Sequence, residues 1–170
     1  MREPKSWDNV FMDMAFAASQ RSKDPSTQCG AILVGIDRIV LATGFNGPPS
    51  TMDDNFVQRD KRPEKYAYII HAEENCLWTA IEAHGGIRVK GSTIYVTHRP
   101  CSDCLLRLIR SKVAVIKYPK SASPWDKTQY MKYQVDPLTL IMAQLYPKIV
   151  LEEIPYGSSE FRNTGQTYPM

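Results

Sequence analysis

The chain has 170 residues, which is enough for one domain with a buried core. Hydrophobic residues make up 43% and charged residues 23%, as in ordinary folded proteins, so the composition excludes a disordered or fibrous chain. The net charge of +3 argues against a nucleic-acid polymer as partner but is compatible with a small phosphorylated ligand.

No stretch of the sequence is typical of a leader or a membrane span. Residues 1–9 are charged, and the most apolar region, residues 31–45, is interrupted by Asp37 and Arg38. We therefore expect a cytoplasmic protein, in a reducing compartment where cysteines are thiols or metal ligands. The chain has four cysteines: Cys29, Cys76, Cys101 and Cys104.

The first part of the chain predicts a helix, a hairpin and a long loop. Apolar residues recur at helical spacing over residues 7–20. Two β-branched runs, residues 29–34 and 39–45, are separated by a short turn that contains glycine, which predicts a β-hairpin. Residues 46–67 are polar and contain prolines, and an irregular loop of this length usually has a function.

The second part alternates helices and strands. The predicted elements are a helix over residues 71–83, a strand over 93–97, a helix over 101–111, a strand over 113–118, a helix over 137–146 and a strand over 149–154. The strand–helix–strand unit favours parallel pairing. Together the elements predict an α/β fold with a five-stranded mixed sheet and helices on both faces. We assign residues 1–154 to a single domain and residues 155–170 to an extended or disordered tail.

Residues with metal-binding side chains stand at the starts of two predicted helices. His71 and Glu73 open one, and Cys101 and Cys104, which follow Pro100, open the other. Cysteines three residues apart lie on one helix face, and the positive end of the helix favours their thiolate form. One imidazole and two thiolates leave the fourth zinc position for water, which zinc activates at neutral pH. Glu73 could then accept and return the water's proton, as hydrolysis of an amidine requires.

Two other interpretations of the cysteine pair are a redox pair and a structural zinc site. A redox pair would leave His71 and Glu73 without a role. A structural site would need a fourth ligand, and the other histidines, His84 and His98, do not have metal-ligand spacing with the pair. The combination H-x-E with P-C-x-x-C is the signature of zinc deaminases, so we favour a catalytic zinc site.

Three further segments carry a resemblance to a known family. They are residues 20–31 (QRSKDPSTQCGA), 44–49 (GFNGPP) and 66–75 (YAYIIHAEEN). With the zinc motifs, they resemble the cytidine deaminase superfamily and within it the deoxycytidylate deaminases. The similarity runs in register over residues 7–118 and fades beyond, and residues 120–135 do not align.

This resemblance implies a three-layer α/β/α fold and hydrolysis of dCMP to dUMP and ammonia, which supplies thymidylate synthesis. It implies Zn²⁺ on His71, Cys101 and Cys104, with Glu73 as the proton shuttle. It also implies that Asn46 binds the deoxyribose and that the backbone at Ala72 holds the pyrimidine.

The remaining ligand contacts are open to more than one interpretation. From sequence alone, Asn46 could instead serve a left-handed turn. Arg21, Lys23 and Ser26 follow the first helix in one turn, and Arg21 and Ser26 are our candidates for binding the 5′-phosphate. A solvated surface cluster is the alternative for all three.

The family resemblance further implies a homohexamer that is activated by dCTP with Mg²⁺ and inhibited by dTTP. The candidate effector residues are Gly44, Asn46, Gly47, Lys23, Arg59 and Lys61. A solvated loop is the alternative explanation for the cations of residues 59–62. Thr79 and Glu82 differ from some relatives, which have an aromatic residue and an arginine there.

Other classes of protein remain as alternatives. Related zinc deaminases act on tRNA adenosine, guanine, free cytidine or cytosine in polynucleotides. The free-cytidine branch commonly has cysteine at the position of His71, and a polynucleotide enzyme needs a basic groove with stacking aromatics. An inactive, zinc-stabilised nucleotide-binding module is a further possibility, in which Glu73 would have no function.

Overall fold

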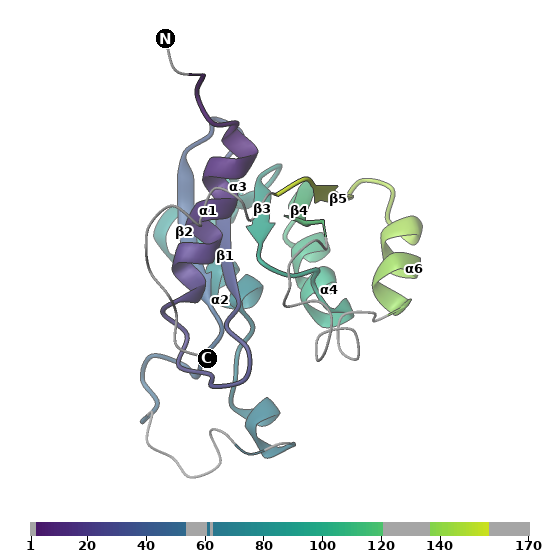
Figure 1. Ribbon diagram of the computed structural model, residues 1–170. Helices are drawn as coiled ribbons and strands as arrows, with labels where there is room; N and C mark the ends of the chain where they lie inside the picture. The colour runs from purple at the N-terminus through teal and green to yellow at the C-terminus, as the bar shows by residue number, and fades with distance from the viewer. Residues whose placement is uncertain (1–2, 54–60, 62, 121–136, 157–170) are drawn as a thin grey trace.

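The computed structural model describes residues 3–53, 61, 63–120 and 137–156 (Figure 1). Its helices are α1 (Trp7–Ser19), η1 (Glu64–Ala67), α2 (Ala72–His84), α3 (Gly86–Val89), α4 (Ser102–Arg110) and α6 (Pro137–Leu145). Its strands are β1 (Gly30–Val34), β2 (Val40–Phe45), β3 (Thr93–Val96), β4 (Val115–Pro119) and β5 (Val150–Ile154).

The strands form one mixed sheet in the order β2-β1-β3-β4-β5. Strand β1 is antiparallel to both β2 and β3, whereas β3, β4 and β5 are parallel. The predicted five-stranded mixed sheet is therefore confirmed, including the hairpin and the parallel strand–helix–strand unit.

Helices cover both faces of this sheet, as predicted. Alternate side chains of β1 serve the two cores, because successive residues of a strand point to opposite faces. Ile32 and Val34 pack with Phe11 and Met12 of α1. On the other face, Leu33 packs in the core that α2 and α4 close (Figure 1). Buried residues of α2 and α4 in that core are Ala72, Cys76, Leu77, Ala80, Leu105 and Leu108.

The predictions were wrong in several local details. Helices η1 and α3 were not predicted, because single turns carry too little periodicity to be recognised. Gly85, with φ of 74°, ends α2, and the chain enters α3 directly. Strand β4 begins at Val115 rather than Val113, because the Val113 N–H donates to the Leu108 carbonyl at the end of α4.

Parts of the predicted loop and tail lie outside the described residues, namely residues 54–60, 62, 121–136 and 157–170. At the start of the predicted tail, the Tyr156 hydroxyl donates to Asp13 at 2.7 Å and its ring stacks on Phe16 at 5.0 Å. Tyr156 therefore packs on α1. Within the described ranges, no helix combines the length and apolar character needed to cross a bilayer.

Gly44 allows the start of α2 to lie directly on β2. A Cβ atom at Gly44 would lie 2.4 Å from the Ala72 carbonyl oxygen and 2.5 Å from the Cys76 backbone nitrogen. Because backbone atoms cannot rotate away, Gly44→Ala should displace α2 and lower the free energy of unfolding by about 1–3 kcal/mol.

Urea denaturation measures this effect. Gly86→Ala is the control, because a Cβ there meets nothing within 4 Å. We expect the control to stay within about 0.5 kcal/mol of wild type. Equal denaturation midpoints for Gly44→Ala and wild type would contradict the close approach of α2 to β2.

Candidate active site

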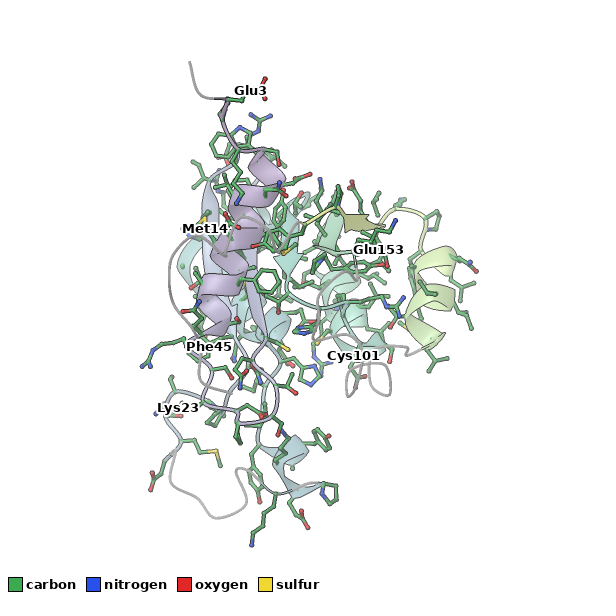
Figure 2. All side chains as sticks on the ribbon, in the orientation of Figure 1. Glu3, Met14, Lys23, Phe45, Cys101 and Glu153 are labelled. Carbon is green, nitrogen blue, oxygen red and sulfur yellow. The ribbon has the colours of Figure 1, made fainter. Side chains whose placement is uncertain are left out.

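The starts of α2 and α4 bring three metal-binding side chains together. His71 precedes the first turn of α2, and Cys104 lies in the first turn of α4. Cys101, labelled in Figure 2, precedes that turn of α4. The His71 Nδ1 atom is 3.5 Å from the Cys101 Sγ atom and 3.3 Å from the Cys104 Sγ atom. All three ligand atoms lie within 4.8 Å of one another, so the chain brings together the residues that the spacing predicted.

These distances fit a tetrahedral zinc ion. Zinc–nitrogen and zinc–sulfur bonds of about 2.1 and 2.3 Å separate the two ligand atoms by about 3.6 Å at a tetrahedral angle. Hydrogen bonds from Cys104 and His71 lower the pKa of Cys101 to about 4, and the bond to Cys101 raises the pKa of His71 to about 9. The hydrogen bond to Cys101 also raises the pKa of Cys104, so one thiolate and the His71 imidazolium balance each other, and a zinc ion would release the protons of His71 and Cys104 on binding.

The alternative interpretations of the cysteine pair find no support in the geometry. Cys101 and Cys104 both lie beside His71, at 3.5 and 3.3 Å, a contact to which a redox pair gives no role. Within the described ranges, no fourth ligand, whether histidine, cysteine or carboxylate, joins these three residues. His84 contacts the carbonyl oxygen of Leu41 at 2.9 Å instead, and His98 contacts Cys29 at 3.3 Å. Three protein ligands without a fourth are typical of a catalytic zinc site.

Glu73 lies in the first turn of α2 and is only 8% exposed. Burial raises the pKa of its carboxyl group above the usual range, although the positive charge of His71 acts in the opposite direction. A carboxyl group with a raised pKa can both take and return a proton near neutral pH. Glu73 therefore has the environment of a general acid and base.

The Asn46 side chain holds two chain segments together. Its Oδ1 atom accepts from the Cys29 N–H at 2.7 Å, and its Nδ2 group donates to the Thr27 carbonyl at 2.9 Å. In the described part of the chain, the non-glycine residues with positive φ are Arg38 and Lys112. Asn46 therefore does not adopt a left-handed conformation, and that alternative is wrong. The contact of Asn46 with deoxyribose stays a prediction.

Backbone hydrogen bonds attach this loop to the segment that precedes His71. Gly47 and Ile70 form an isolated antiparallel bridge, with hydrogen bonds of 3.1 and 2.9 Å in the two directions. As a result, His71 follows directly on a residue paired with the Asn46–Gly47 loop. The backbone thus fixes the start of α2 relative to the candidate sugar-binding residue.

The structure gives the positions of the other residues that were predicted to bind substrate or effector, and their ligand contacts stay predictions. Arg21, Lys23 and Ser26 are exposed on the turn after α1, where Figure 2 labels Lys23. Lys61 is also exposed, and Arg59 lies outside the described residues. Gly44 is buried under α2, and Ala72 is 1% exposed. Thr79 and Glu82 lie on the exposed side of α2.

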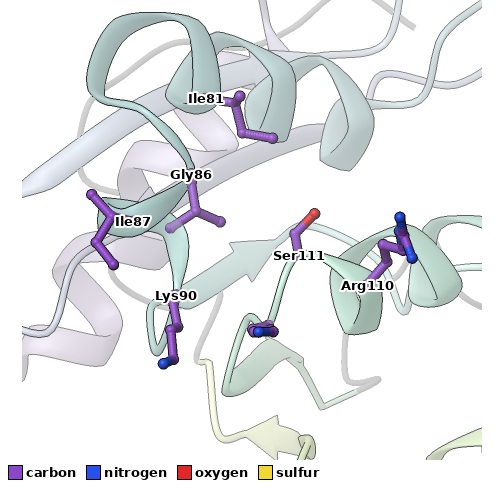
Figure 3. A pocket seen from close by; sticks show the side chains of 8 residues that line it. Ile81, Gly86, Ile87, Lys90, Arg110 and Ser111 are labelled. Atoms are coloured by element: carbon purple, nitrogen blue, oxygen red, sulfur yellow. The ribbon is translucent and has the colours of Figure 1, made fainter.

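A basic pocket of about 420 Å³ lies at the opposite ends of α2 and α4 from the metal cluster (Figure 3). Its walls include Lys90, Arg110 and Lys112. Cations are common at helix C-termini because the negative end of the helix dipole stabilises them. The helix C-termini therefore account for the positive charge of this pocket without a ligand. The candidate metal site lies at the other ends of α2 and α4, at their N-termini.

Comparison with known proteins agrees with this geometry. Residues 5–119 match the model of the cytidine and deoxycytidylate deaminase zinc-binding region, which is more than half of the chain. The chain belongs to this zinc deaminase family. Membership and the His71–Cys101–Cys104 cluster together support zinc as the metal of the site.

Relatives within the zinc deaminase family are about a third identical to this chain over the aligned segments. Deoxycytidylate deaminase from Mus musculus is 35% identical over 112 residues, or 63% of this chain and 61% of that protein. The chain thus spans 61% of the length of the mouse protein. The uncharacterized deaminase in the luxG 3′ region of Aliivibrio fischeri is 35% identical over 129 residues, or 76% of this chain and 83% of that protein.

Solved structures of the zinc deaminase family show the same fold. The apo crystal structure of dCMP deaminase from the cyanophage S-TIM5 has a TM-score of 0.67 and 24% sequence identity. The match covers 89% of this chain and 100% of the phage chain. The predicted cytidine deaminase-like fold is thereby confirmed.

One buried contact near the site has no signal in the sequence. Lys65, in η1, is 2% exposed and forms an ion pair with Asp24 at 2.7 Å. A lysine in a polar loop is ordinarily solvated, and 41 residues separate it from its partner, so the sequence contains no signal for this pair.

Proposed function

We propose that this protein hydrolyses dCMP to dUMP and ammonia. The observation that carries the proposal is the His71–Cys101–Cys104 cluster next to the buried Glu73. The name of the mouse relative, deoxycytidylate deaminase, supports dCMP as the substrate.

The mechanism assigns one role to each side chain. A zinc ion held by His71, Cys101 and Cys104 supplies a polarised water when it is bound. Glu73 takes a proton from that water and delivers it to the ring nitrogen next to the amine-bearing carbon. After the oxygen has added to that carbon, Glu73 takes the remaining proton from the added hydroxyl and delivers it to the amine, which leaves as ammonia. Water and dCMP thus become dUMP and ammonia, and Glu73 ends unchanged.

Substrate recognition is assigned to the segments around Asn46. Asn46 binds the deoxyribose, and the Ala72 backbone orients the pyrimidine over the metal cluster. Arg21 and Ser26 bind the 5′-phosphate. Their exposure, on a turn whose next residues are bonded to the Asn46 side chain, supports this assignment.

Regulation by nucleotides completes the proposal. dCTP with Mg²⁺ activates and dTTP inhibits a cytoplasmic homohexamer that provides dUMP for thymidylate synthesis. The exposed cations Lys23 and Lys61, in the two segments next to the Asn46–Gly47 loop, support a site for a triphosphate. Residues Gly44, Asn46, Gly47 and Arg59 complete the proposed effector set.

The test is ammonia release by the zinc-loaded protein from a panel of substrates. dCMP, CMP, dCTP, deoxycytidine and a cytosine-containing oligonucleotide are supplied in parallel. We expect selective turnover of dCMP, because Arg21 and Ser26 provide a site for one phosphate and Asn46 a contact for the deoxyribose, whereas a strand would need a basic groove with stacking aromatics. Turnover of the oligonucleotide or of deoxycytidine, without turnover of dCMP, would show that dCMP is not the substrate.

The same assay tests regulation with effectors that are not themselves the substrate. We expect dCTP with Mg²⁺ to raise the rate on dCMP and dTTP to lower it. Rates that are unchanged with every triphosphate would overturn the regulatory part of the proposal and leave the chemistry standing.

A further inference from the structure

A buried ion pair joins two segments at the edge of the candidate site. The Lys65 ammonium donates to both oxygens of the Asp24 carboxylate, at 3.0 and 2.7 Å. The two side chains are only 3% and 5% exposed. Such a pair is costly to bury, and its loss on one side leaves an uncompensated charge.

Asp24 also organises the turn that carries the candidate phosphate-binding residues. Its Oδ1 atom accepts from the Ser26 N–H at 2.8 Å and from the Thr27 N–H at 3.2 Å. Burial raises the pKa of Asp24, but hydrogen bonds from Lys65 and Ser26 outweigh that effect and hold it below the usual value. The carboxylate is therefore ionised at neutral pH, in the same turn as Ser26.

Lys65 connects this turn to the start of α2. It lies in η1, five residues before Ile70, whose backbone pairs with Gly47. Its ammonium is also 3.4 Å from the Ser26 hydroxyl. The ammonium of Lys65 is thus bonded within the turn. Because its side chain is only 3% exposed, it cannot contact a ligand directly.

The pair lies within electrostatic reach of the catalytic carboxylate. Burial raises the pKa of the Cys29 thiol, and the charges of Glu73 and Asp24 raise it further, while Lys65 lowers it. Cys29 therefore lies within range of the charges of both the ion pair and Glu73. A net charge at residues 24 and 65 would act on a dianionic ligand bound at this turn.

We propose that Lys65 is a positioning residue that makes the turn after α1 compatible with an anionic substrate. By neutralising Asp24, it removes the repulsion that this carboxylate would exert on a 5′-phosphate. It also holds the turn so that Arg21 and Ser26 face the ligand. This inference rests on the proposed function, because the phosphate belongs to dCMP.

The test compares a ligand that carries the phosphate with one that lacks it. Dissociation constants of dUMP and deoxyuridine are measured by calorimetry on the zinc-loaded protein. We expect Lys65→Met to weaken dUMP about ten- to a hundredfold and deoxyuridine by less than about threefold. The dUMP deficit should shrink as salt is added, because it is electrostatic.

Three further variants distinguish charge from structure. Asp24→Asn should keep or strengthen dUMP binding, because it leaves the positive charge of Lys65 unopposed beside the anionic ligand. The double variant Asp24→Asn with Lys65→Met should restore dUMP binding to within about threefold of wild type. Lys148→Met, which removes an exposed lysine between α6 and β5 and outside every proposed site, should leave both ligands' affinities and the unfolding midpoint unchanged.

The outcomes separate this inference from the proposed function. Equal weakening of dUMP and deoxyuridine in Lys65→Met would show a merely structural role and overturn the inference. If Lys65→Met does not fold, loss of dUMP binding in Asp24→Asn or in the double variant would overturn it. Failure of the wild type to turn over dCMP would instead overturn the proposed function.

Discussion

Glu73→Gln should lower turnover of dCMP by about 10³–10⁴-fold, near the upper end of what a general acid and base contributes. Glutamine keeps the shape of the side chain but can neither accept the water's proton nor return it. We expect zinc content to stay at the wild-type level, since Glu73 is outside the cluster of ligand atoms. Steady-state kinetics and metal analysis on the same preparation measure both quantities.

The stability of the same variant provides an independent check. Because burial raises the pKa of Glu73, its ionised form is disfavoured in the folded protein at neutral pH. Removing that charge should therefore leave the melting temperature unchanged or higher. A variant with low activity and a lowered melting temperature would indicate misfolding rather than lost chemistry.

Glu74→Gln is the matched control for Glu73→Gln. Glu74 follows directly in the chain, but its carboxylate accepts from the exposed Arg107 side chain at 3.1 Å. Exposed ion pairs contribute little to stability. We expect wild-type turnover from Glu74→Gln, and a loss equal to that of Glu73→Gln would contradict the assignment of Glu73.

Cys101→Ala should abolish zinc binding and turnover together. Outer hydrogen-bond partners of metal ligands already change affinity by about ten- to a hundredfold, so loss of a ligand should cost more than that. Zinc bound to the folded state stabilises it, and the melting temperature of the variant should therefore no longer rise when zinc is added. Metal analysis and thermal denaturation with and without zinc measure these effects.

Cys76→Ala is the control for loss of a thiol. Cys76 is fully buried in the core, and its thiol contacts the Ala42 carbonyl at 3.5 Å rather than the metal cluster. This variant should lose some stability but keep one zinc per chain. Full activity and zinc content in Cys101→Ala would show that Cys101 is not a ligand.

Most of the fold was predictable because its signals are local. The apolar periodicity of α1 and the glycine-containing turn between β1 and β2 lie within stretches of a few residues. The parallel pairing of β3 with β4 follows from the short helix that connects them. Elements of a single turn, η1 and α3, were missed because four residues span only about one helical period, which is too short to show a repeating pattern.

The metal cluster was predictable to a similar degree for the same reason. Cys101 and Cys104 share one helical turn, and His71 and Glu73 share another, so residue spacing alone groups each pair. That the two turns meet depends on α2 and α4 packing on the same face of the sheet. The sequence predicted this meeting through the combined H-x-E and P-C-x-x-C signature and through the family resemblance, and the fold provides the distances.

Around the candidate site, the residue types follow from the sequence, whereas their contacts follow from the tertiary structure. The sequence by itself determined which residue types are available: three metal ligands, a carboxylate and an amide in a glycine-rich loop. Only the tertiary structure decided that Asn46 holds Thr27 and Cys29 and that Lys65 is buried on Asp24. These partners are 17 to 41 residues apart, and a charged side chain has the same sequence signature in solvent as in an ion pair. Burial, which packing alone creates, is what distinguishes the two.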